Sequence, residues 1–280
     1  MTRKPVDDTI SAIPGAWRFD AEVSRAFEAH VRKSVPFYDE LQRMLVELSD
    51  YFVRDQSVIY DLGSATGVTL DLLAAHHAAK EAARFVGVDC SESMVQEAQA
   101  RVKWPSVRFI HQNVMDVRFV PPANFVVGLY TLQFLTLAER RQLLARVYAG
   151  MVEGGALLLA EKTRAENSCF EDVWLELYWD FKRRQGLSPE QILDKANCLR
   201  GVLNPLTAGE NVDLLFQTGF SRVELFFKWY NWSGFLAVKN DCLRPPRNED
   251  IMSTTARSRR PAGETTPRSE PRAPRASEHS

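Results

Sequence analysis

The sequence predicts an α/β domain built on a mostly parallel sheet, and three observations support this fold class. Short apolar runs alternate with helical patterns between residues 57 and 161, which is typical of a parallel sheet covered by helices on both faces. A glycine-rich segment, residues 60–67, joins the first of these strands to the first helix. Two later β runs, residues 222–227 and 234–238, are joined by residues 230–233 and predict a C-terminal antiparallel hairpin at the sheet edge.

Two helices are expected ahead of the sheet. Apolar residues recur at every fourth position over residues 19–31, which predicts an amphipathic helix capped by Asp20. Pro36 suits the first position of a second helix, whose apolar stripe covers residues 41–48. We expect these helices to form a helical N-terminal lid or brace.

The core elements then alternate along the chain. Each predicted strand is a short apolar run, and the helices between the strands have apolar residues at helical spacing. The predicted strands are residues 57–61, 84–89, 107–111, 125–130 and 156–161, and the predicted helices are residues 67–79, 92–103 and 137–150.

A helical insertion over about residues 168–217 is expected between the last core strand and the hairpin. Its first helix has an apolar face and ends near Gly186. A second helix begins with Ser188 at the cap and Pro189 at the first position. A third covers about residues 207–217.

The predicted domain spans residues 16–242 and is flanked by two segments of different composition. Residues 1–15 are interpreted as a flexible arm. Residues 243–280 hold eight arginines, six prolines and almost no large apolar side chains, so they cannot bury enough surface to offset chain entropy. We therefore expect a disordered tail rich in Arg, Pro and Ser.

The composition of the chain argues against several kinds of binding partner and catalytic site. The chain has 280 residues and a net charge of −1, so no overall field recruits nucleic acid or a membrane surface. Its four cysteines form no C-x-x-C pair, which argues against a zinc site and favours reduced thiols in the cytoplasm. No apolar run approaches the length of a membrane span, and the N-terminus does not have the pattern of a signal peptide. The sequence shows no Ser-His-Asp set and no His/carboxylate metal cluster, so we expect neither a hydrolase nor a metal site.

The glycine-rich turn is the first candidate ligand site. Gly63 and Gly67 are four residues apart, so the turn has neither the G-x-G-x-x-G dinucleotide fingerprint nor a P-loop. With Asp61 it follows the acidic-x-Gly-x-x-x-Gly pattern of S-adenosylmethionine (SAM) binding proteins. Glycine allows positive φ and a close approach of ligand to backbone, and the N–H groups that begin the next helix face the strand end. The alternative is a turn that only packs a helix on the sheet.

Asp89 is the second candidate. It ends the second predicted strand, about 25 residues after the glycines, near the place where an acid contacts a ribose diol in related folds. A carboxylate suits that role because it accepts two hydroxyl hydrogens at once. The alternative role is to cap the helix that begins near Ser91, and both roles can hold together.

A resemblance to a known family extends over about residues 17–239. It is carried by seven short stretches, residues 17–20, 34–38, 60–63, 131–135, 154–157, 161–162 and 180–183. These resemble the carboxy-S-adenosyl-L-methionine (carboxy-SAM) synthase family of class I SAM-dependent methyltransferases. The resemblance implies a Rossmann-like class I methyltransferase fold, a homodimer through the helical insertion, and conversion of SAM and prephenate into carboxy-SAM and phenylpyruvate. In that family a helper enzyme then uses carboxy-SAM in tRNA wobble-uridine modification.

The same resemblance assigns positions that contact SAM. A tyrosine closes over the ligand, the glycine turn surrounds the methionine part, and an acid with its neighbour contacts the ribose. A further pair of residues lies at the adenine ring. In this sequence the matching positions are Tyr38; Gly63, Ser64 and Ala65; Asp89 and Cys90; and Asn113 and Val114.

Two positions depart from the family pattern. Leu129 stands where the family has asparagine, and Ala196 stands where it has the arginine that holds the extra carboxylate. A charge-assisted bond of roughly 1.5–3 kcal/mol would then be missing. Lys195 is expected to point elsewhere on its helix, whereas Arg200, four residues after Ala196, lies on the same helix face and is the candidate substitute.

Three functions remain open at this point. The first is a SAM-dependent methyltransferase whose acceptor is a small molecule or tRNA-related, and the second is a carboxy-SAM synthase. The third is a non-catalytic SAM-binding scaffold with the tail as an interaction arm. Methyl transfer depends mainly on alignment of the reactants. The catalytic candidates are Tyr38, Tyr130 and Arg200, with His111 and Tyr178 also near strand ends.

Two charged groups have alternative interpretations. Glu161 and Lys162 end the fifth predicted strand, where side chains face the ligand crevice, or they form a surface ion pair. Asp180, Lys182 and Arg183 are interpreted as a solvated helix face or as part of an acceptor site.

Overall fold

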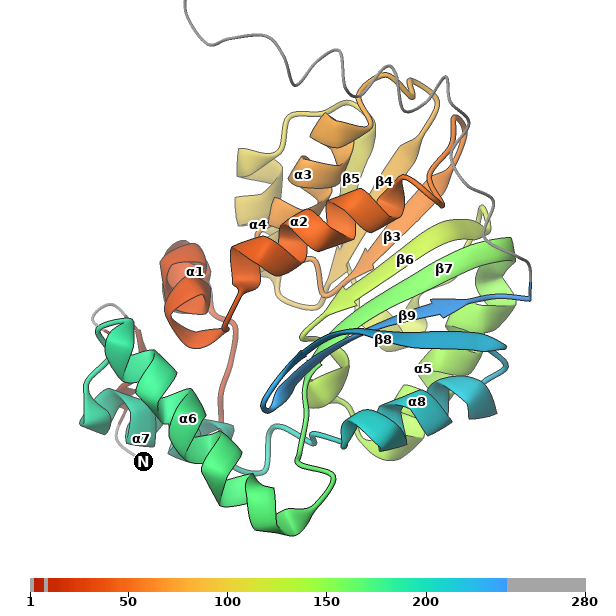
Figure 1. The fold of residues 1–280 in the computed structure, drawn as a ribbon. Coiled ribbons are helices and arrows are strands. Elements are labelled where there is room, and N and C mark those ends of the chain that lie inside the picture. Colours follow the sequence, from red (N-terminus) through yellow and green to blue (C-terminus); the bar gives the residue numbers. More distant parts are fainter. Residues whose placement is uncertain (1–2, 8–9, 241–280) are drawn as a thin grey trace, which may run out of the picture. The chain divides into compact units, whose positions relative to one another are not determined.

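A central sheet organises the described part of the chain, residues 3–7 and 10–240 of a computed structural model (Figure 1). Within these residues the sheet has seven strands in the order β5-β4-β3-β6-β7-β9-β8. The first five strands in sequence run parallel, while β9 is antiparallel to both of its neighbours. The strands are β3 (Val58–Leu62), β4 (Arg84–Asp89), β5 (Val107–His111), β6 (Ala123–Leu129), β7 (Met151–Lys162), β8 (Arg222–Trp229) and β9 (Trp232–Val238).

The predicted α/β class and the C-terminal hairpin are thus confirmed. The hairpin connection is shorter than expected, because Trp232 and Ser233 already belong to β9 and only Tyr230 and Asn231 form the turn. The predicted tail, residues 243–280, lies outside the described residues.

Helices cover both faces of the sheet, as the alternation of apolar side chains along each strand requires. In β3, Ile59 faces one layer, which α2, α3 and α4 cover, and Tyr60 faces the layer covered by α5 and α8. The helices of the two layers are α2 (Tyr38–Ser49), α3 (Val68–His76), α4 (Glu92–Arg101), α5 (Leu137–Gly150) and α8 (Ala208–Gln217). Three short 3₁₀ helices, η1 (Val114–Asp116), η2 (Leu132–Phe134) and η3 (Ser168–Phe170), lie in the connections.

A smaller helical group lies beside one end of the sheet (Figure 1). It consists of α1 (Ala21–Ser34), α6 (Glu171–Arg184), α7 (Pro189–Leu199) and the ribbon of β1 (Lys4–Pro5) and β2 (Ser11–Ala12). Val6 and Ile10 are fully buried in a cluster with Trp17 and Cys198. The described residues of the predicted flexible arm therefore pack against the domain, because their apolar side chains find a partner in the helical group.

The residues at the starts of the helices show which capping signals in the sequence predicted the helix boundaries. Asp20 accepts hydrogen bonds from the backbone N–H groups of Glu22 and Val23, and Ser188 forms a capping box ahead of Pro189, as predicted. The prediction for Pro36 was wrong, since α2 begins at Tyr38. Phe37 has a φ of 55° and packs against the rings of Phe227 and Trp229. Tertiary packing of that ring therefore delays the start of the helix.

Gly63→Ala is expected to lower the free energy of unfolding more than Gly186→Ala. Both glycines have positive φ, +79° and +90°, where a Cβ costs about 1–2 kcal/mol. A Cβ at Gly63 would also overlap the Thr131 side chain, whereas nothing lies within 4 Å of one at Gly186. Overpacking of this kind adds about 1–3 kcal/mol. Urea denaturation measures the difference, and equal losses would show that Thr131 yields without cost.

Candidate functional site

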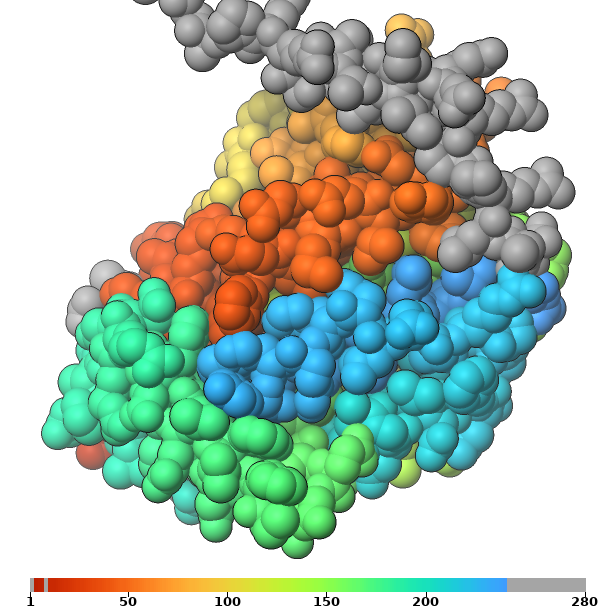
Figure 2. All heavy atoms as spheres, viewed as in Figure 1, coloured from red at the N-terminus to blue at the C-terminus, as the bar shows by residue number. Residues whose placement is uncertain are grey.

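A cavity of about 780 Å³ lies at the carboxyl ends of the parallel strands. The strand order reverses between β3 and β6, and such a reversal point is where open α/β sheets bind ligands. Residues of α1, α2, α6 and α7 line the other walls. The space-filling view shows the N-terminal helices (red and orange) meeting the α6–α7 segment (green) on one face (Figure 2). Of the two helices predicted as an N-terminal lid or brace, α1 covers the strand ends together with α6 and α7, and α2 contributes to the cavity wall while packing on a face of the sheet.

The glycine turn forms the first wall of the cavity. The N–H groups of Gly63 and Ser64 donate to the Val88 carbonyl at 2.8 and 3.0 Å, which ties the turn to the end of β4. Ala65 has a φ of 44°, and its N–H donates to Asp89 Oδ2 at 2.9 Å. The backbone of this turn is thus held in a fixed shape that faces the cavity.

Two buried polar atoms at this turn have no hydrogen-bond partner within the described residues. They are Asp61 Oδ2 and the Ser64 hydroxyl oxygen, and both residues line the cavity. Burial, followed by the nearby Asp89 charge, raises the pKa of Asp61 to about 8. Unpaired buried acceptors are costly in a folded protein. A ligand that donates hydrogen bonds to this corner would remove that cost.

Asp89 lines the cavity and is fixed by the backbone. Its two oxygens accept from the N–H groups of Ala65 and Ser91, at 2.9 and 2.8 Å. Ser91 itself caps α4 through its hydroxyl. Burial raises the pKa of Asp89, and the two backbone bonds lower it. The carboxylate is therefore oriented by the helix start, and each oxygen retains a lone pair for a ligand.

The remaining positions assigned by resemblance also line the cavity. Cys90 is exposed with a free thiol, and Val114 is buried at the base of η1. Asn113 caps η1, since its side-chain oxygen accepts from the Met115 N–H at 2.9 Å. One lone pair of the Asn113 side-chain oxygen therefore already accepts a hydrogen bond, and only the other is available to the adenine ring.

Three tyrosines form an aromatic wall opposite the glycine turn. The Tyr38 and Tyr130 rings lie 6.5 Å apart, and Tyr130 packs edge-on against Trp232 at 5.3 Å. The Tyr178 hydroxyl donates to the Ser34 carbonyl at 2.8 Å. Burial raises the pKa of all three phenols. None of them is poised to lose a proton near neutral pH, so they shape the cavity rather than act as bases.

Three lysines line the same cavity beside the aromatic wall: Lys162, Lys182 and Lys195. The Lys182 and Lys162 ammonium groups lie 4.5 and 5.2 Å from the centre of the Tyr178 ring. In residues 3–7 and 10–240 neither of these two ammonium groups makes a hydrogen bond or a salt bridge. Burial lowers the pKa of each lysine, and at Lys182 the charges of the other two lower it further. An anion would relieve both the desolvation and the repulsion.

Lys195 is positioned by a buried chain of polar groups. Asp7 Oδ2 lies 2.5 Å from His30 Nδ1, and His30 Nε2 contacts the Lys195 ammonium. Burial, and then the Lys195 charge, lowers the pKa of His30 to about 4, so the ring is neutral at physiological pH. The ring N–H is therefore on the Asp7 side, and Nε2 accepts from the lysine. The lysine also lies 4.2 Å from the centre of the Trp17 ring.

The positions that depart from the family pattern lie in the same region. Leu129, Ala196 and Arg200 all line the cavity, and Arg200 is exposed at its edge. The expectation that Arg200 lies on the same helix face as Ala196 was wrong, because α7 ends at Leu199 and Arg200 has an extended backbone. The expectation that Lys195 points elsewhere was wrong, because its side chain is buried in the cavity wall. Of the two interpretations of Lys182, the solvated helix face was wrong, because the side chain is buried in the cavity lining.

Two other candidates lie outside the cavity lining. His111 is exposed and donates to the Cys90 carbonyl at 3.0 Å. Glu161 is buried and accepts from the N–H groups of Leu132 and Gln133 at 3.0 and 2.7 Å. Burial raises the pKa of Glu161 to about 8 against the effect of these bonds and of Arg140. Glu161 thus fixes the loop after β6, and it is not a surface partner of Lys162.

Comparisons with known proteins agree with this geometry. A family model described as "Methyltransferase domain" matches residues 59–155. A carboxy-SAM synthase of Staphylococcus epidermidis is 34% identical over 227 residues, which cover 81% of this chain and 98% of that protein. A carboxy-SAM synthase of Methylococcus capsulatus is 35% identical over 225 residues, covering 79% and 93%.

Solved structures extend the likeness at the level of the fold. Human N-acetylserotonin methyltransferase superposes with a TM-score of 0.53 at 14% identity, over 79% of this chain and 56% of that one. An O-methyltransferase family protein of Burkholderia thailandensis gives 0.54 at 19% identity, over 79% and 60%. The chain thus spans little more than half the length of these two structures, and it shares their Rossmann-like methyltransferase fold. No helix among the described residues is both long and apolar enough to cross a membrane.

Asp61→Asn is expected to weaken SAM binding by about 1.5–3 kcal/mol, the value of a hydrogen bond to a charged group. The unpartnered carboxylate oxygen in the cavity wall would accept from the α-ammonium of SAM, and an amide of the same size would not attract that charge. Calorimetric titration with SAM measures the loss. Asp213→Asn, at an exposed position, is the control, and equal affinities for the two variants would remove Asp61 from the SAM site.

Proposed function

This chain belongs to the carboxy-S-adenosyl-L-methionine synthase family and is a SAM-dependent transferase, and from that premise we propose that it makes carboxy-SAM from SAM and prephenate. The observation that carries the proposal is the lysine cluster, Lys162, Lys182 and Lys195, in the cavity beside Ala196. The cluster would take the role that the family's arginine has at position 196.

The carboxylate-lined corner is the proposed SAM site. The unpartnered oxygens of Asp61 and Ser64 fit the α-ammonium of the methionine part, and Gly63 leaves room for a ligand against the backbone. Asp89 would hold the ribose, with Cys90 beside it. The other proposed contacts are Tyr38, Ala65, Asn113 and Val114. Bound SAM supplies an activated methyl group, and the chain's own residues orient it and exclude water.

The lysine-lined side is the proposed prephenate site. Prephenate carries two carboxylates, and the described cavity lining offers three lysines and Arg200 but no acid other than Asp61 and Asp89. Each buried carboxylate–ammonium hydrogen bond contributes roughly 1.5–3 kcal/mol. The cavity thus has an acidic corner for the cationic ligand and a basic side for the anionic one.

Lys195 would be the primary anchor, because it is the lysine that the rest of the chain holds in place. His30 accepts a hydrogen bond from its ammonium group, and Asp7 fixes the His30 ring. Lys162 and Lys182 are free to turn toward a carboxylate without breaking a hydrogen bond in the described structure. Arg200, exposed at the edge of the cavity, would meet the second carboxylate.

A second candidate is a methyltransferase that acts on an anionic small molecule. It is favoured by the two departures, Leu129 and Ala196, which remove an amide and a guanidinium from the cavity wall. The lysine cluster would then bind the carboxylate or phosphate of the acceptor. A tRNA-related acceptor is less well supported, since the chain has a net charge of −1.

Mass spectrometry distinguishes the two candidates. Purified protein is incubated with SAM and prephenate, and the products are compared with those of SAM alone. A species heavier than SAM by the mass of CO₂, formed together with phenylpyruvate, supports carboxy-SAM synthesis. Unchanged prephenate with SAM bound would contradict it and direct the search to an anionic methyl acceptor.

Lys182→Met is expected to raise the stability of the protein while weakening prephenate binding. The substitution removes a buried ammonium group whose pKa is lowered well below its usual value by burial and by its two neighbours, and replacing such a charge by an apolar side chain is often stabilising. The loss of one anion contact would raise the Kd for prephenate about tenfold or more.

The control for this substitution is Lys103→Met, at an exposed position, which should change neither quantity. Thermal unfolding and calorimetric titration with prephenate are measured on each variant, with SAM affinity as a further reference. A Lys182→Met protein that binds prephenate as tightly as the parent would exclude Lys182 from the anion site.

Prephenate binding should weaken as the pH rises through about 7. Burial lowers the pKa of Lys195 to about 7, so the lysine carries its charge below that pH and loses it above. Binding of a carboxylate favours the charged form of Lys195, so above the pKa of this lysine prephenate binding is accompanied by uptake of a proton. Titrations across this range measure the dependence, and Lys195→Met should flatten it. An unchanged pH profile in that variant would assign the titration to another group.

A further inference from the structure

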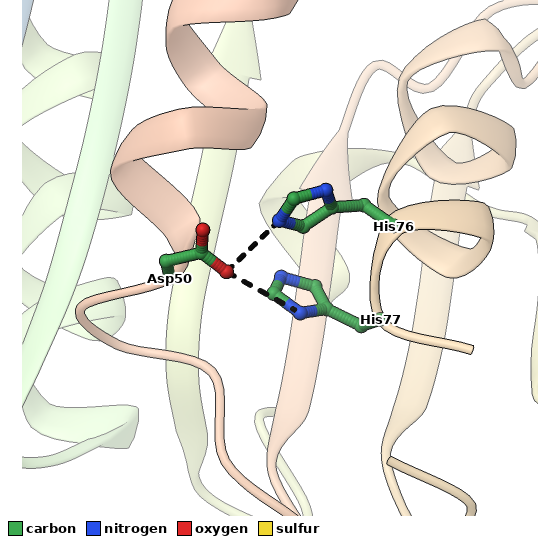
Figure 3. Close-up of side chains that lie close together, drawn as sticks. All are labelled: Asp50, His76 and His77. Carbon is green, nitrogen blue, oxygen red and sulfur yellow. Dashed lines mark hydrogen bonds and ion pairs between the residues drawn. The ribbon is translucent and has the colours of Figure 1, made fainter. Parts of the chain in front are cut away.

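A second cluster of chemically active side chains lies between α2 and α3. Asp50 follows the end of α2, His76 ends α3 and His77 comes directly after it. Figure 3 shows both imidazole rings turned toward the Asp50 carboxylate. Asp50 Oδ1 lies 2.9 Å from His76 Nε2 and 3.9 Å from His77 Nδ1. One ligand atom from each residue lies within 4.8 Å of the others.

The spacing of these atoms suits a single small cation. Zinc lies about 2.0–2.2 Å from nitrogen and oxygen ligands, so its ligands are separated by at most about twice that distance. The two distances from Asp50 Oδ1, 2.9 and 3.9 Å, fall within this limit. Small rotations of the side chains would therefore bring all three atoms to one ion.

The hydrogen bonds around His77 already select the tautomer that a metal requires. Its Nε2 lies 2.7 Å from the Ser49 hydroxyl, which itself donates to the Val46 carbonyl at 2.6 Å. The hydroxyl therefore accepts from the Nε2–H of His77, which leaves a lone pair on Nδ1, the atom that faces Asp50. A partner that accepts from the second ring nitrogen is the usual support of a histidine ligand.

A cation already approaches the same lone pair. The Lys80 ammonium lies 2.8 Å from His77 Nδ1. Its side chain is only partly buried and is long and flexible, so it can turn into solvent. Arg54 is a second nearby cation, but its guanidinium is bound to the Asp50, Val53 and Tyr51 carbonyls. The Lys80 ammonium would therefore compete with a metal ion for His77 Nδ1 and lower the affinity of the site for the ion.

We propose that Asp50, His76 and His77 form a binding site for a late first-row divalent ion such as Zn²⁺. A set of two imidazoles and one carboxylate binds such ions more tightly than it binds Mg²⁺ or Ca²⁺. The site lies at the starts of the parallel strands, because Asp50 precedes β3 and His77 precedes β4, whereas the cavity lies at their carboxyl ends. The ion would link α2 to α3 and would not take part in the transfer reaction.

The expectation that the chain has no His/carboxylate cluster was wrong, because Asp50 and His76 are 26 residues apart in the sequence and meet only in the fold. The packing of α2 alongside α3 in the same direction brings their C-terminal ends together, with Gln42 bonded to Thr69 near the N-terminal ends of the two helices.

The test is titration of the full chain with ZnCl₂, followed by calorimetry and by thermal unfolding, and with CoCl₂, followed by visible absorption. We expect one ion per chain, a rise in Tm with Zn²⁺, and the absorption of a low-symmetry Co²⁺ site. His76→Ala and Asp50→Asn should each weaken binding at least about tenfold. Lys80→Met should tighten it.

His111→Ala is the matched control, because His111 is an exposed histidine outside the cluster and its loss should leave the Zn²⁺ affinity unchanged. The Tm of each variant without metal shows that it folds. The proposal is overturned if the parent does not bind Zn²⁺, or if His76→Ala and Asp50→Asn bind it as the parent does. Unchanged or weaker binding by Lys80→Met would also contradict the placement of the ion beside His77 Nδ1.

Discussion

The close packing of the chain where it leaves β3 and β6 is the constraint on which the site depends. Gly63 follows β3, and the Thr131 side chain occupies the space where its Cβ would be. Behind this contact the Glu161 carboxylate holds the N–H groups of Leu132 and Gln133. The two loops are thus fixed against each other from both sides. Because backbone atoms rather than long side chains cover this point, the space above the strand ends remains available as a cavity.

The acids and the lysines of the cavity lining lie on separate walls. Asp61 and Asp89 are the acids of the described lining, and both belong to strand ends on the side of the glycine turn. The lysines come from the end of β7 and from α6 and α7. Burial destabilises the charged form of each group, as the raised pKa of Asp61 and the lowered pKa of Lys182 show. Binding a cation at one wall and an anion at the other would relieve both costs at the same time.

Much of the fold could be predicted from the sequence, because it depends on local signals. The positions that the family resemblance assigns to SAM all line the cavity. The periodicity of apolar residues predicts the strands and helices, and the spacing of Asp61, Gly63 and Gly67 predicts the ligand-binding turn. Orientation on a helix could not be predicted in the same way. Lys182 has charged neighbours, so a solvated helix face and an acceptor contact both remained open, and the packing of α6 shows that the side chain is buried in the cavity lining. Phe37 and the N-terminal ribbon were misjudged for the same reason, since their partners are distant in sequence.

The N-terminal ribbon is short, yet the basic side of the cavity depends on the residues beside it. Asp7 is buried beside β1, and its negative charge raises the pKa of Lys195 against the effect of burial. Through His30 it also sets the hydrogen bond that orients the lysine. Without Asp7 the His30 ring would lose its acceptor, and Lys195 would lose both its orientation and part of its charge. An arginine remains charged in almost any setting, whereas a lysine anchor requires this support. In the proposed function, use of a lysine beside Ala196 would therefore depend on the packing of Asp7 into the domain.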